Sequence, residues 1–102
     1  MNYLLQKPNQ MDKHETQVNF RYWKKEVIAL FPYLIADPQG HVTSYMHVGQ
    51  HGAACYDHII RKSKPATKEQ RKELAKELKG LGYNLEIIKR RNRAKYLANL
   101  KN

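Results

Sequence analysis

The segment VNFRYWKKEVIALFPYLI (residues 18–35) decides the fold, because alternating polar and apolar residues give way to an almost continuous apolar run. Side chains in a β-strand point alternately to opposite faces, and residues 18–23 place β-branched and aromatic side chains on one of them. Residues 26–36 are apolar nearly throughout, which is typical of a strand that is covered on at least one face. A tight connection at Lys24–Lys25 joins the two predicted strands. We therefore expect two neighbouring antiparallel strands, the second of them central in a sheet.

The segments that follow each predict a single element. DPQG (residues 37–40) has the chemistry of a type I turn, with Asp first, Pro second and Gly last. The alternation in HVTSYMHV (residues 41–48) predicts a third strand, which makes a meander with the first two. Beyond Gly49, apolar residues recur at helical spacing and predict a helix over residues 50–62.

A second helix and a fourth strand complete the predicted domain. Thr67 and Gln70 stand at the spacing of a capping box, in which each side chain binds the backbone amide of the other residue. The helix that begins there has one apolar stripe, formed by Leu74, Ala75, Leu78 and Leu81. YNLEIIKR (residues 83–90) predicts a strand that faces the core through Leu85 and Ile87.

The predicted order of elements is therefore β-β-β-α-α-β. We expect an α+β fold, with a four-stranded, mainly antiparallel sheet and the helices on one face. Residues 17–91 are expected to form this single domain, after a mobile N-terminal arm over residues 1–16 that is polar and without periodicity. Residues 92–102 are expected to be a basic tail in which RAKYLANLK can form a short helix.

The composition is that of one globular domain. Of 102 residues, 41% are hydrophobic and 27% are charged, close to globular averages. A single cysteine excludes an internal disulfide. The first residues lack the apolar run of a secretory signal, and no apolar stretch approaches the roughly 20 residues of a membrane span. We expect a cytoplasmic protein that does not bind membranes or a cofactor, and the sequence leaves its oligomeric state open.

The net charge of +10 is concentrated at the C-terminus. Residues 89–102 contain six bases and no acid, whereas the other 88 residues contain thirteen bases and nine acids. Guanidinium groups bind phosphate through paired hydrogen bonds, so such a cluster is typical of a protein that binds nucleic acid. Aromatic side chains next to basic residues add surfaces on which the nucleobases of a single strand stack.

Non-enzymatic binding of RNA or DNA is therefore the predicted function. The candidate binding residues come from the C-terminal cluster and from the basic, aromatic segment RYWKK, and they are Lys89, Arg90, Arg91, Arg93, Lys95, Arg21 and Trp23. No helix-turn-helix, zinc-finger, RNP or GxxG signature accompanies them. An interaction or regulatory module with an acidic protein partner is the alternative, because the same positive charge would serve it.

Three histidines and the cysteine lie within the twelve residues HVGQHGAACYDH, from residue 47 to residue 58. On the predicted helix, His51, Cys55 and His58 stand at i, i+4 and i+7, one turn beyond His47, a spacing that suits zinc or an imidazole-activated thiolate. A small metal- or thiol-dependent enzyme centred on Cys55 is thus a further alternative. The apolar residues of that helix lie opposite the histidines, which favours a solvated polar face, so we assign no metal ligand and no catalytic residue.

Four segments carry a resemblance to known sequences: EVIALFP, SYMHVGQHGAACYDHI, KPATKEQ and GYNLEIIKRR. Together they resemble a group of small uncharacterised bacterial proteins over residues 18–91. That group has no assigned activity, so the resemblance implies a small domain and transfers no site residue.

Overall fold

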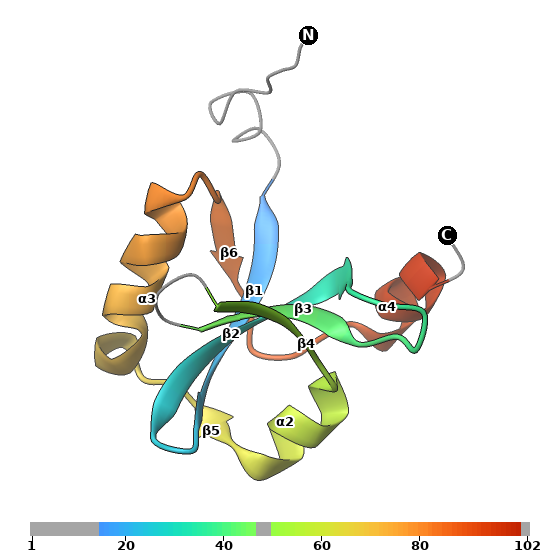
Figure 1. Ribbon diagram of the computed structural model, residues 1–102, viewed down its shortest axis with the longest axis horizontal. Coiled ribbons are helices and arrows are strands. Elements are labelled where there is room, and N and C mark those ends of the chain that lie inside the picture. Colours follow the sequence, from blue (N-terminus) through green and yellow to red (C-terminus); the bar gives the residue numbers. More distant parts are fainter. Residues whose placement is uncertain (1–14, 47–49, 101–102) are drawn as a thin grey trace, which may run out of the picture.

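The computed structural model describes residues 15–46 and 50–100, which form a curved sheet with helices on both faces (Figure 1). Four strands make an antiparallel meander in the order β4-β3-β2-β1: β1 (Thr16–Trp23), β2 (Glu26–Ile35), β3 (Val42–Met46) and β4 (Gln50–Ala54). Two short strands pair with β1 along its other edge: β5 (Lys64–Pro65), antiparallel, and β6 (Leu85–Ile87), parallel. The helices in this part of the chain are α2 (Tyr56–Lys62), α3 (Lys68–Gly80) and α4 (Arg93–Leu100).

The α+β class and the mainly antiparallel sheet are confirmed, but the number of strands and their order are not. The described chain runs β-β-β-β-α-β-α-β-α, with six strands instead of four. The main error lies at residues 50–54, which were predicted as the first turns of a helix and instead form β4. Without β4, the edge of β3 that faces away from β2 would expose a row of backbone donors and acceptors. β4 pairs with these groups from Met46 opposite Gln50 to Val42 opposite Ala54. The helix begins only at Tyr56.

The prediction that the helices share one face is also wrong. On β2, Ala29 and Phe31 point to the face covered by α3, whereas Ile28 and Leu30 point to the face covered by α2 and α4. A strand that is apolar on both faces must be covered on both to keep its side chains from water. In Figure 1, α3 accordingly lies beside β6, and α2 and α4 lie away from it.

The hairpin between β1 and β2 is confirmed, with Trp23 opposite Glu26 at its end. Both loop residues adopt left-handed backbone conformations, at φ 51° for Lys24 and 67° for Lys25. Two positive φ angles in a two-residue loop match the right-handed twist of the strands. The chain therefore makes this turn at some conformational cost, because lysine has a Cβ that disfavours positive φ.

Helix α3 follows the sequence prediction at its start and in its core. The capping box between Thr67 and Gln70 is present, and Leu74 and Leu78 are buried against the sheet. Leu81 was expected on the same stripe but is 55% exposed. The helix ends at Gly80, so Leu81 is the C-cap residue and no longer follows helical spacing.

At the C-terminus the predicted short helix is present as α4, whereas at the N-terminus β1 begins at the last residue of the predicted arm. Residues 1–14 of the predicted arm lie outside the described residues, and Thr16 already belongs to β1, opposite Leu85. Of the predicted tail, α4 packs on β2, and the hydroxyl of Tyr96 donates a hydrogen bond of 2.6 Å to the carbonyl of Gly40. Residues 101–102 lie outside the described part. Within residues 15–46 and 50–100, no helix has the length and apolar character to cross a membrane.

Candidate functional site

The structure separates the five candidate bases of the C-terminal cluster into different environments. Lys89 and Arg90 are exposed in the bend between β6 and α4, and Arg93 is exposed at the start of α4. The Nζ of Lys95 lies 4.4 Å from the centroid of the Tyr33 ring. These four side chains are accessible to a ligand, whereas the side chain of Arg91 is not.

Arg91 is the centre of an arginine clamp, which we define as Arg91 with Tyr56, Tyr96 and Asp57. Its guanidinium carbon lies 4.2 Å from the Tyr56 ring centroid and 3.7 Å from that of Tyr96. Its side chain is 5% exposed, and one guanidinium nitrogen is 3.2 Å from a carboxylate oxygen of Asp57. Because Tyr56 belongs to α2 and Tyr96 to α4, the clamp joins the two helices on one face of the sheet.

A chain of hydrogen bonds connects the clamp to β1. The backbone amide of Arg91 donates to the Tyr56 hydroxyl, which donates to the side-chain oxygen of the buried Asn19. The amide group of Asn19 donates in turn to the carbonyl of Ile88. Burial raises the pKa of the Tyr56 phenol, an effect that the nearby Arg91 opposes. The guanidinium of Arg91 therefore holds parts of the fold together, and its charge is paired within the protein.

Arg21 and Trp23, the candidates from β1, are also engaged within the fold. Arg21 is 8% exposed, and its guanidinium donates to the Ser63 hydroxyl and to the carbonyls of Ser63 and Ile60, just beyond and within α2. Burial lowers the pKa of this guanidinium. Trp23 is half-buried against the core on the α2 face, with the Nζ of Lys24 4.6 Å from its ring centroid. Arg21 therefore anchors α2 to the sheet.

The predicted line of His51, Cys55 and His58 along one helix does not exist. His51 lies on β4, Cys55 is the N-cap residue of α2, and His58 lies within α2. His51 contacts aromatic residues instead, with its ring 4.6 Å from that of Tyr45. His47 lies outside the described residues. Among the residues that are described, no three His, Cys, Asp or Glu side chains are grouped so that they could hold a metal ion.

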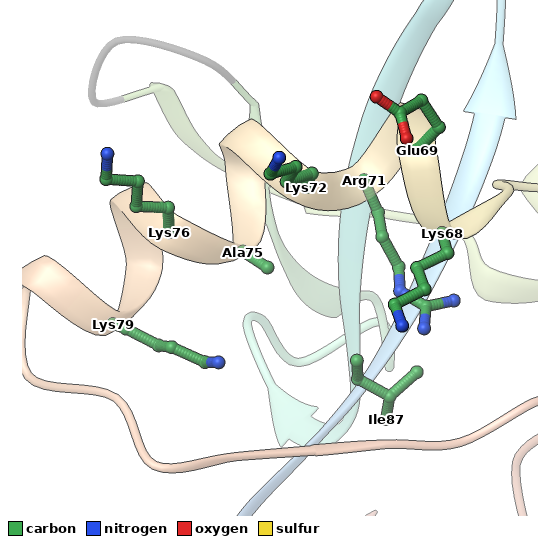
Figure 2. A pocket seen from close by; sticks show the side chains of 8 residues that line it. All are labelled: Lys68, Glu69, Arg71, Lys72, Ala75, Lys76, Lys79 and Ile87. Atoms are coloured by element: carbon green, nitrogen blue, oxygen red, sulfur yellow. The ribbon is translucent and has the colours of Figure 1, made fainter.

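A groove of about 540 Å³ lies between α3 and β6, and Figure 2 shows its lining. The described lining residues are five cations, one carboxylate and two apolar side chains: Lys68, Arg71, Lys72, Lys76, Lys79, Glu69, Ala75 and Ile87. We call it the basic groove. In Figure 2, Lys68, Arg71 and Lys79 extend from α3 toward Ile87, while Lys72 and Lys76 point away from it.

The cations of the basic groove form a row along the axis of α3. Lys68 and Lys79 are eleven residues apart, which is about 16 Å along a helix that rises 1.5 Å per residue. The other three stand between them, Arg71 on the side toward Ile87 and Lys72 and Lys76 on the side away from it (Figure 2). Lys89 is two residues beyond Ile87, so its Cα lies within about 7 Å of that of Ile87. The exposed Lys89 and Arg90 therefore follow closely in the chain on Ile87, the residue that forms the groove wall.

The sequence predicts that most of these cations lie on the solvated face of a helix, but it does not predict a groove. One signal was available: Lys68, Lys72, Lys76 and Lys79 recur every three or four residues, which places them on one side of α3. The opposite wall was not predictable from such spacing. It exists because β6 pairs in parallel with β1, which brings Ile87 opposite Val18 and next to α3.

Comparisons of the chain with models of protein families, with curated proteins and with solved structures give no match, so the function must be inferred from the side chains themselves.

Proposed function

We propose that the protein is a cytoplasmic module that binds nucleic acid through the basic groove and the adjoining Lys89 and Arg90. The observation that carries this proposal is the row of five cations along α3, with one acid among the described residues that line the groove. A row of positive charges matches a polymer of regularly spaced phosphates. Each contact with a phosphate releases condensed counter-ions, and this release supplies most of the sequence-independent affinity for nucleic acid.

The proposed interface differs from the C-terminal cluster alone. Arg91 and Arg21 hold helices in place, so neither offers its guanidinium to a ligand without loss of packing. Lys89 and Arg90 remain exposed beside the basic groove. Arg93 and Lys95 are accessible on α4, which covers the other face of the sheet, so they lie outside the proposed interface.

The test is a fluorescence-anisotropy titration with labelled RNA and DNA, single-stranded and double-stranded, at several salt concentrations. The groove variant is Lys68→Gln with Lys79→Gln. Lys68 begins α3 and Lys79 is in its last turn, so the effects of the two losses on the helix dipole oppose each other. The matched control is Arg61→Gln with Lys62→Gln, which also removes two exposed charges but from α2, on the other face of the sheet.

We expect the groove variant to bind more weakly and to reduce the slope of log K against log salt by about 1.4 for a single strand and about 1.8 for duplex DNA. The control variant should leave that slope close to the value of the unaltered protein. Equal losses in both variants would mean that only net charge matters, and would overturn the assignment to the basic groove. Affinity for polyglutamate equal to that for nucleic acid would favour an acidic protein partner instead.

A further inference from the structure

We infer that the basic groove selects single-stranded over double-stranded nucleic acid, an inference that rests on the proposed function. The feature that carries it is the apolar part of the lining, where Ala75 of α3 and Ile87 of β6 lie among the cations. Ile87 is 44% exposed although it is a large hydrophobic residue. A ligand that covered Ile87 would gain the free energy of removing this apolar surface from water.

The two forms of nucleic acid differ in what they offer to such a surface. A duplex stacks its bases inside and presents phosphates and groove edges outside, so it would meet the cations and leave Ile87 in water. A single strand has free base faces and sugars that pack against apolar and aromatic side chains. The single strand therefore uses both parts of the lining at once, and the duplex uses one.

The size of the basic groove points to the same ligand. A duplex is stiff and can meet only the rim of a groove of about 540 Å³, whereas one flexible strand can bend into it. The row of cations, about 16 Å long, offers positive charge to several successive phosphates of that strand. A short flexible strand lying along α3 can therefore follow the cations and cover Ile87 at the same time.

The experiment separates the apolar contact from the charges with Ile87→Ala and a matched control, Leu34→Ala. Leu34 lies on β2 and is 43% exposed, nearly the same as Ile87, but it does not line the basic groove. A second variant, Ile87→Thr, keeps the β-branched side chain that favours a strand and guards against loss of β6. Each protein is titrated with a single-stranded oligonucleotide of about 12 nucleotides and with its duplex, after circular dichroism has shown that it is folded.

We expect tighter binding of the single strand than of the duplex. Ile87→Ala should weaken single-strand binding by about tenfold, the effect of withdrawing about two methylene groups from an apolar contact. The salt slope and the affinity for duplex should stay unchanged, and Leu34→Ala should have no effect on either ligand.

Two results would overturn the inference and leave the proposed function standing: duplex binding as tight as single-strand binding, or an equal loss for both ligands in both Ile87 variants. In either case the salt slope would still fall in Lys68→Gln with Lys79→Gln. Failure of both ligands to bind the unaltered protein would instead refute the proposed function.

Discussion

Removal of the Arg91 side chain should destabilise the protein far more than removal of its neighbour Arg90. A cation over an aromatic ring contributes about 0.5–1 kcal/mol when exposed and about 2 when withdrawn from water. Arg91 lies against two rings and its side chain is 5% exposed. Its ion pair adds little, since Asp57 is 57% exposed and such pairs contribute about 0–1 kcal/mol. We therefore expect Arg91→Ala to cost about 2–4 kcal/mol, and Arg90→Ala less than about 0.5.

Urea unfolding measures this difference, with the fluorescence of Trp23 as the signal, since this single tryptophan packs on the same core cluster as Tyr56 and Tyr96. On heating, a loss of 2–4 kcal/mol should lower the Tm by about 10–20 °C. Arg91→Lys should lose part of the stability despite keeping the charge, because an ammonium group cannot stack as a planar guanidinium does. Equal unfolding midpoints for Arg91→Ala and Arg90→Ala would show that the clamp does not hold α2 and α4.

Three further changes test other parts of the fold. Gly40→Ala should lower the free energy of unfolding by about 1–3 kcal/mol, because φ is +88° there and the new Cβ would lie 2.8 Å from the hydroxyl oxygen of an α4 tyrosine. Gly80→Ala, with open space around it, should not destabilise the protein. Lys24→Asn with Lys25→Gly should raise the free energy of unfolding by about 1 kcal/mol by relieving two positive φ angles; a lower urea midpoint would contradict this account of the turn. Burial raises the pKa of Tyr56, so the folded state keeps its phenolic proton after the unfolded chain has lost it, and stability should fall as the pH rises above about 10. In Tyr56→Phe this fall, measured by urea titrations at pH 9 and above, should be smaller.

The sequence predicts those elements of the fold whose pattern is local. The alternation of residues 18–23, the turn at residues 37–40 and the capping box at Thr67 depend on near neighbours, and all three are present. Residues 50–54 form a strand although Ala53 and Ala54 favour a helix locally. Pairing with β3 decides the structure of residues 50–54, and this pairing cannot be deduced from those five residues alone.

The same distinction explains the candidate site. A run of basic residues in a sequence shows their charge but not their burial, so the exposed Arg90 and the buried Arg91 look alike. Only the positions of Tyr56 and Tyr96 in space distinguish them. The basic groove was missed for a related reason, since Ile87 completes it through parallel pairing between segments at opposite ends of the chain.

That pairing of β6 with β1 has a consequence for synthesis on the ribosome. The meander of β1 to β4 and the helix α3 are complete before residue 85 is made, whereas the edge of β1 at Thr16–Val18 must wait for β6 to pair with it. Until then the first strand exposes unpaired backbone groups, which is the condition under which strands associate with other chains. Ile87 is therefore made after the other described residues that line the groove, and a nascent or truncated chain that ends before it would carry the cations of α3 without the surface that lies opposite them. The proposed binding site is thus complete only once β6 has been made and has paired with β1.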